Sequence, residues 1–184
     1  MENNGEQLRD FVYSGPLIDF VRAANDCCLY LEALKGDEGR DFISTMVNHL
    51  SAVYNLYLGL GETSPVFDSG VEPTVSEQDW STLFQRIALI LKEHNDVVRI
   101  AEDQEFDRSE IVRHTISEDL SDVYQELRDF TSIYSRGIEE LMNDAAWELQ
   151  QRFTEHWGGK LLRALLALHT LYTEGVDPGG EEHV

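Results

Sequence analysis

Two sets of charged side chains at helical spacing could do chemistry in this sequence. The acidic set lies within residues 117–134 and consists of Asp119, Asp122, Glu126 and Asp129. The basic set comes later in the chain and consists of Arg152, His156, Lys160 and Arg163. Projected at about 100° per residue, each set covers an arc of about 80° that borders the apolar face of its own helix. Each helix therefore carries one charged edge beside its buried side.

The two charged edges permit two interpretations. If the helices pack antiparallel, the edges face each other and form interhelical ion pairs beside the buried seam. Alternatively, the carboxylates and His156 form a metal or acid-base site, because such groups on facing helices can converge. The sequence has no Glu-x-x-His pair from two helices, no His-x-x-x-His and no Cys-x-x-Cys. We therefore expect no metal and no cofactor.

The aromatic and histidine residues near the basic edge have a structural and a functional interpretation. A histidine beside an apolar face is usually a hydrogen-bonded packing residue, and this applies to His156 and His169. Trp157 is expected in the core or at its rim, or as the wall of a small pocket next to His156.

Apolar side chains that recur every three to four residues predict the helices that position these groups. The expected helices begin after Ser14-Gly15-Pro16, near Arg40, after Ser76 and at Ser117, which is the expected N-cap. A last long helix follows them. The stripe of Leu149, Phe153 and Trp157 keeps its phase in Leu161, Ala164 and Leu168, beyond Gly158 and Gly159. This continuity predicts one helix over residues 143–173. Residues 92–115 show neither clean period and are expected to form a loop, with at most one short strand or turn.

The expected architecture is an all-α, single-domain bundle of five or six helices built from antiparallel helical hairpins. Residues 1–10 are expected to be a frayed N-terminus, residues 11–174 the helical domain, and residues 175–184 a disordered acidic tail. The chain of 184 residues and 21.0 kDa is long enough to bury a true core.

Charge and the absence of membrane signals limit the partners. The chain has 14 basic and 35 acidic side chains, a net charge of -21, which disfavours nucleic acid and anionic membranes. No apolar run approaches about 18 residues and the start lacks a signal peptide, so a cytoplasmic location is expected. Adjacent side chains diverge on a helix, so Cys27 and Cys28 are predicted to be buried, reduced thiols.

Several motifs resemble a bacterial family known as domain of unknown function 5063. They are Asp19-Phe-Val21 through Cys28 and Glu32, the stretch from Leu50 to Leu60, Trp80, the segment Glu118-Asp-Leu-Ser-Asp-Val-Tyr-Gln-Glu-Leu-Arg-Asp129, Trp147, His156-Trp-Gly158, Arg163-Ala-Leu and Leu168-His169. The resemblance implies an all-helical bundle without an assigned activity, and it adds Tyr124 to the residues of interest. Where such proteins often carry a second histidine after His-Trp-Gly, this sequence has Lys160, which weakens a metal site inferred by likeness.

Each candidate site residue comes from a charged edge or from a family motif. They are Asp119, Asp122, Tyr124, Glu126, His156, Trp157, Lys160, Arg163 and His169. The leading hypothesis is a non-catalytic helical module that binds a protein partner. The alternative is a small-molecule or metal-dependent enzyme that uses the carboxylate and histidine cluster. A third hypothesis, an acidic decoy of nucleic acid, depends on the charge alone.

Overall fold

The computed structural model describes residues 2–68, 70–103 and 108–180. In chain order the elements are α1 (Glu2–Val12), α2 (Gly15–Ala33), α3 (Gly39–Tyr57), α4 (Glu77–Leu91), a 3-10 turn η1 (Lys92–Asn95), β1 (Asp96–Asp103), β2 (Arg108–Thr115), α5 (Ile116–Tyr134), α6 (Glu139–Arg152), a π-helical turn η2 (Phe153–Trp157) and α7 (Gly158–Glu174).

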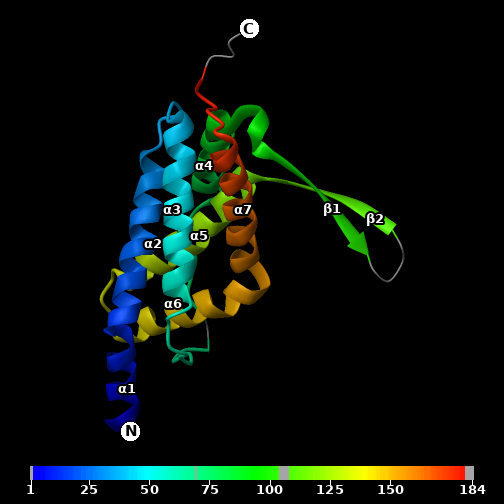
Figure 1. The fold of residues 1–184 in the computed structure, drawn as a ribbon. Coiled ribbons are helices and arrows are strands. Elements are labelled where there is room, and N and C mark those ends of the chain that lie inside the picture. The colour runs from blue at the N-terminus through cyan, green and yellow to red at the C-terminus, as the bar shows by residue number, and fades with distance from the viewer. Residues whose placement is uncertain (1, 69, 104–107, 181–184) are drawn as a thin grey trace.

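The predicted all-α bundle is confirmed, with α5 as its central helix. Helix α5 packs against α2, α4, α6 and α7, while α3 lies between α2 and α7 (Figure 1). One continuous core joins these helices, and Phe20, Met46, Leu120, Trp157 and Leu168 are essentially inaccessible in it. Because α5 is covered from several sides, it also buries polar side chains, including Asp119 and Glu126.

Helix caps follow the sequence at most of the expected starts. Ser14 caps α2, with Pro16 in the first turn, and Ser76 and Asp79 form a complete capping box at α4. The predicted cap of α5 is wrong by two residues, because the Thr115 hydroxyl accepts the Glu118 amide. Ser117 is buried inside the first turn instead.

The prediction of one long helix over residues 143–173 is wrong, because the chain turns sharply between α6 and α7 (Figure 1). The turn is the π-helical segment η2, in which the Gly158 amide donates to the Phe153 carbonyl. A methyl group at Gly158 would lie 2.6 Å from that oxygen, so glycine permits the close approach. Both helices bury one face, and the apolar phase therefore continues across the bend.

Residues 92–115 were expected to form a loop, and this prediction is wrong as well. Strands β1 and β2 pair antiparallel from Asp96 opposite Thr115 to Asp103 opposite Arg108. The hairpin leaves the bundle beside the start of α5 and projects away from it (Figure 1). Frequent charged residues interrupt the apolar alternation that would have indicated a strand.

The two ends of the chain are more ordered than expected. Helix α1 occupies the segment predicted to be frayed and packs on α6, with Val12 fully buried and the Tyr134 hydroxyl donating to its carbonyl. At the other end, Pro178 is buried and Asp177 accepts the Arg40 amide at 3.1 Å. Residues 175–180 therefore fold back on the start of α3, and residues 181–184 of the predicted tail lie outside the described residues.

No helix in the described part of the chain has both the length and the apolar character needed to cross a membrane. Cys27 and Cys28 are free and buried on α2, as predicted.

Candidate functional site

A row of ion pairs joins α5 to the chain from α6 to α7. Its members, which we call the polar row, are Asp119, Asp122 and Glu126 from α5 and Arg163, Lys160 and Arg152 opposite them. Residue numbers rise along one side of the row and fall along the other, as expected for antiparallel packing. The sequence thus predicted the geometry of these two edges.

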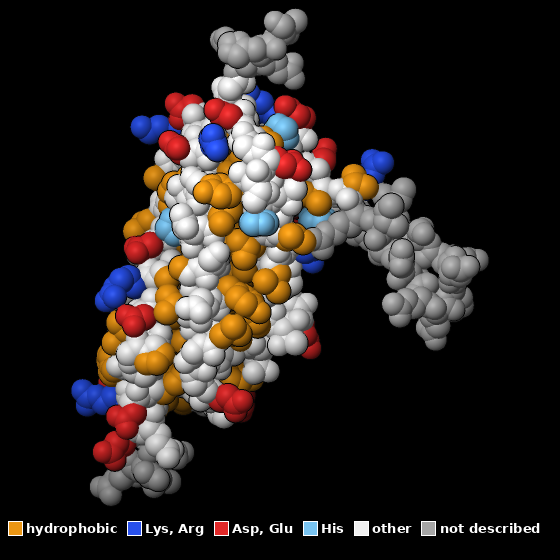
Figure 2. Space-filling model, viewed as in Figure 1, with side chains coloured by type: hydrophobic (Ala, Val, Ile, Leu, Met, Phe, Trp, Pro, Cys, Tyr) orange, Lys and Arg blue, Asp and Glu red, His pale blue; other side chains and the backbone are white. Residues whose placement is uncertain are grey.

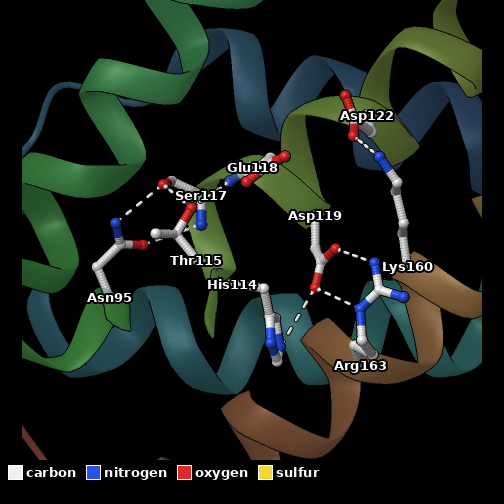
Figure 3. A network of polar contacts seen from close by, with 9 residues as sticks. All are labelled: Asn95, His114, Thr115, Ser117, Glu118, Asp119, Asp122, Lys160 and Arg163. Carbon is white, nitrogen blue, oxygen red and sulfur yellow. Dashed lines mark hydrogen bonds and ion pairs between the residues drawn. The ribbon is translucent and has the colours of Figure 1, made fainter. Parts of the chain in front are cut away.

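One pair of the polar row joins Asp119 and Arg163 through two hydrogen bonds (Figure 3). The Arg163 Nη2 and Nε atoms donate to the two carboxylate oxygens at 2.6 and 3.2 Å, which is a bidentate arrangement. The Asp119 carboxylate is 3% exposed, and its hydrogen bond raises the pKa of the Arg163 guanidinium. The buried Asp119 carboxylate is tolerated because the partly exposed Arg163 guanidinium compensates its charge.

Sequence reasoning missed His114, which joins the same end of the row. It lies on β2, and its Nε2 atom is 3.6 Å from the Asp119 Oδ2 atom (Figure 3). Both ring nitrogens are buried without a hydrogen-bond partner among the described residues. The only signal for this residue is its position five residues before Asp119, which has no meaning until the hairpin is known.

Asp122 is held from two sides in the middle of the polar row. Lys160 pairs with its Oδ2 atom, and the Trp80 indole nitrogen donates to its Oδ1 atom at 2.8 Å. Trp80 and Asp122 also line a shallow surface depression next to the start of α4, together with Ser76 and Gln125. Both oxygens of this carboxylate are therefore occupied.

Glu126 lies at the end of the polar row opposite Asp119. Its side chain is 6% exposed, and burial raises its pKa while the Arg152 guanidinium at 3.3 Å opposes that shift. The His156 Nε2 atom is 3.9 Å away, too far for a hydrogen bond. Burial lowers the pKa of His156, and the neighbouring Lys160 and Arg152 lower it further. We therefore expect the imidazole to be neutral near pH 7.

Asp129, the fourth carboxylate of the acidic edge, organises a loop and takes no part in the ion pairs of the polar row. Its Oδ1 atom accepts the Thr74 amide at 2.5 Å, the Thr74 hydroxyl at 2.8 Å and the Val75 amide at 2.8 Å. Its Oδ2 atom is buried without a partner among the described residues, beside a cavity of about 30 Å³ that Glu126 and Arg152 also line. That volume holds one or two waters and is too small for a metabolite.

Three of the predicted site residues lie apart from the polar row. The Tyr124 hydroxyl bonds Glu32 of α2, and burial and this carboxylate raise its pKa to about 12. Trp157 is fully buried and donates its indole hydrogen to the Leu149 carbonyl at 2.9 Å. His169 is exposed on the outer side of α7. The structure therefore brings together Asp119, Asp122, Glu126, His156, Lys160 and Arg163, and adds His114.

The chemistry of this arrangement is that of a structural charge network. Every carboxylate of the polar row already has a cationic partner. Among the residues that the structure describes, no three His, Cys, Asp or Glu side chains are placed to hold a metal ion.

The fold and the polar row define an all-α bundle whose central helix makes ion pairs through largely buried carboxylates. The chain belongs to the family described as "Domain of unknown function (DUF5063)", whose profile matches residues 11–174. Among solved structures, the chain is similar to protein BF1032 from Bacteroides fragilis, a structural genomics target, at 30% identity and a TM-score of 0.76. The match covers 88% of this chain and 94% of that one. The comparison with curated proteins finds no match.

Proposed function

We propose that this chain is a non-catalytic protein-interaction module that presents the β1–β2 hairpin to a partner protein. The observation that carries the proposal is the hairpin itself, which projects from a helical bundle as a two-stranded ribbon (Figure 1). Within the described residues, each strand pairs only with the other, so both outer edges carry free backbone donors and acceptors. Proteins use such edges to add an extended partner segment as a further strand.

The root of the hairpin is fixed firmly enough to present it. Asn95, just before β1, and Ser117, just after β2, exchange two hydrogen bonds of 2.9 Å in the core (Figure 3). On the other side of the root, His114 lies against the pair of Asp119 and Arg163. The polar row therefore supports the proposal by anchoring the ribbon to α5 and α7.

A two-stranded ribbon in water is only marginally stable, and a third strand stabilises it. The net charge of -21 favours a partner segment with net positive charge, through faster encounter and a complementary field. We propose the cytoplasm as the location of this interaction, because Cys27 and Cys28 are free thiols.

The test compares the full chain with a variant whose hairpin is shortened. Because Val98 lies opposite Arg113, the two can be joined by an Asn-Gly turn that replaces residues 99–112 and leaves the root intact. We expect a protein captured from a native lysate by the full chain to be lost with the shortened chain. Equal capture by both chains would contradict the proposal.

Two controls make the comparison specific. The shortened chain should keep the helical circular dichroism spectrum and a cooperative unfolding transition. A full chain with Leu89→Glu, a change on α4 where this side chain is 70% exposed, should capture the same protein as the unmodified chain.

A second candidate function is acid-base chemistry on a small molecule, and one observation favours it. His114, with its unpartnered ring nitrogens, lies beside the buried Asp119, a pairing that enzymes use to orient a general base. A thermal-shift screen of metabolites would test it. Compounds that stabilise the full chain and lose that effect in His114→Ala would support this function over the first.

A further inference from the structure

The surface formed by α3 and α7 is free of acidic residues in a strongly acidic protein. Residues 42–57 of α3 contain no charged side chain, and residues 158–173 of α7 contain Lys160 and Arg163 but no Asp or Glu. At the chain's average of 35 acidic residues in 184, these two stretches would carry about six. The two helices pack side by side, so the stretches form one continuous surface, which we call the acid-free face.

Figure 2 shows the acid-free face toward the viewer. Apolar side chains lie along its middle, and the acidic side chains lie around its border. Leu162 and Leu166 of α7 are 44% and 50% exposed, and Ala52 of α3 is exposed as well. One turn separates the two leucines on α7, so they form an apolar ridge that no element in the described part of the chain covers.

The two cations of the face do not make it a binding surface for anions. Lys160 pairs with Asp122, and Arg163 pairs with Asp119, both at the α5 side of α7. The face is therefore close to neutral, with exposed polar side chains such as Asn48 and Asn55 on α3 beside the apolar ridge of α7. A neutral surface with an apolar ridge suits a partner surface of the same kind, because any charge placed on it would lose water without gaining a counter-charge.

We propose that the acid-free face binds the same face of a second copy of this chain in a twofold dimer. The charge of the chain favours a second copy on this face. Two chains of net charge -21 repel each other wherever their carboxylates meet, and the acid-free face lets them touch without contacts between carboxylates. A twofold axis across the face would place Leu162 and Leu166 of each copy against the other. The inference goes beyond the proposed function, since it needs no part of the hairpin.

The small size of the face indicates a weak interface. Sixteen helical residues span about 24 Å, and two packed helices are about 20 Å wide, which gives on the order of 500 Å² from each copy. That is the low end for a specific interface, so we expect a dissociation constant of about 10 to 100 µM. Added salt should tighten the dimer, because it screens the repulsion between the two anionic bundles.

Sedimentation equilibrium of the purified chain at low and high salt tests this inference. We expect a dimer that strengthens with salt, and at least a tenfold higher dissociation constant for Leu166→Glu, which places two carboxylates in the twofold contact. Leu89→Glu adds the same charge on α4, outside the face, and should dimerise like the unmodified chain. The chain with the shortened hairpin should also dimerise.

A monomer at about 500 µM in high salt would overturn the inference. Dimerisation that Leu166→Glu weakens no more than Leu89→Glu does would overturn it too, because the contact would then lie elsewhere. Neither result affects the capture experiment, so loss of the dimer and loss of the hairpin function can be told apart.

Discussion

The adjacent glycines at the start of α7 should respond oppositely to the same substitution. Gly158 closes the π-helical turn, and a methyl group there would lie 2.6 Å from the Phe153 carbonyl oxygen and 2.9 Å from its ring. At Gly159 the nearest atom to such a methyl group is the Arg163 guanidinium, at 3.8 Å. The pair Gly158→Ala and Gly159→Ala therefore compares a crowded site with an open one on the same helix.

The expected magnitudes follow from helix propensity and packing. Alanine favours a helix by about 1 kcal/mol over glycine, so Gly159→Ala should stabilise the chain by about 0.5 to 1 kcal/mol. At Gly158 the same gain is opposed by overpacking of about 1 to 3 kcal/mol and by loss of the Gly158–Phe153 hydrogen bond, about 1 kcal/mol. The displaced Phe153 ring also stacks on Tyr57, with ring centroids 3.7 Å apart. We expect Gly158→Ala to destabilise the chain by about 1 to 3 kcal/mol.

Urea unfolding followed by circular dichroism and tryptophan fluorescence measures both variants under the same conditions. The difference between them should be about 2 to 4 kcal/mol, with an unchanged dependence on urea. If the two variants have equal stability within about 0.5 kcal/mol, the close approach at Gly158 does not determine the bend and the reasoning is wrong.

Three further predictions concern buried charges and thiols. Arg163→Met should cost about 2 to 3 kcal/mol because it leaves the buried Asp119 carboxylate without its cation, and Asp119→Asn should cost less because the partly exposed Arg163 can turn to water. Equal losses on urea unfolding would contradict this. Burial raises the pKa of Glu126 above its ordinary 4.5, so its contribution to stability is complete below that pH and is lost as the pH rises through the raised pKa. Glu126→Gln should remove this decline above about pH 4.5 from thermal unfolding curves, and a decline that persists would contradict the assignment. Burial raises the pKa of Cys27 to about 12 and that of Cys28 well above its usual range, so both should resist a thiol reagent at pH 8 until the chain is unfolded. Rapid labelling of the native chain would contradict their burial.

The helices and the facing charged edges could be predicted because both depend on local spacing. Apolar side chains three and four residues apart define a buried face, and the two charged arcs border those faces. When α5 and α7 pack antiparallel, Asp119 must face Arg163 and Asp122 must face Lys160, as the structure shows. The pairing of these side chains could therefore be predicted from the sequence.

The bend between α6 and α7 could not be predicted in the same way. A helical projection records the direction of each side chain around the axis, but it does not record a change of the axis itself. Leu149 and Leu161 are both buried, so the stripe looks continuous although the chain turns between them. The close contact of Gly158 with Phe153 exists only in three dimensions.

The hairpin and its histidine were missed for another reason. Strand β1 pairs with β2 through backbone hydrogen bonds, and its short apolar run, which starts with Val97 and Val98, is bordered by charged residues. His114 reaches Asp119 only because the hairpin root holds it there. Contacts between a strand and a helix across a tight junction leave no periodic signal in the sequence.

Hydrogen-deuterium exchange of the chain with and without its captured partner tests the central claim most directly. We expect amides of residues 96–103 or 108–115 to exchange more slowly in the complex, because a third strand would bind the open edge of the hairpin. Unchanged exchange throughout the hairpin, with new protection confined to helices, would contradict the account.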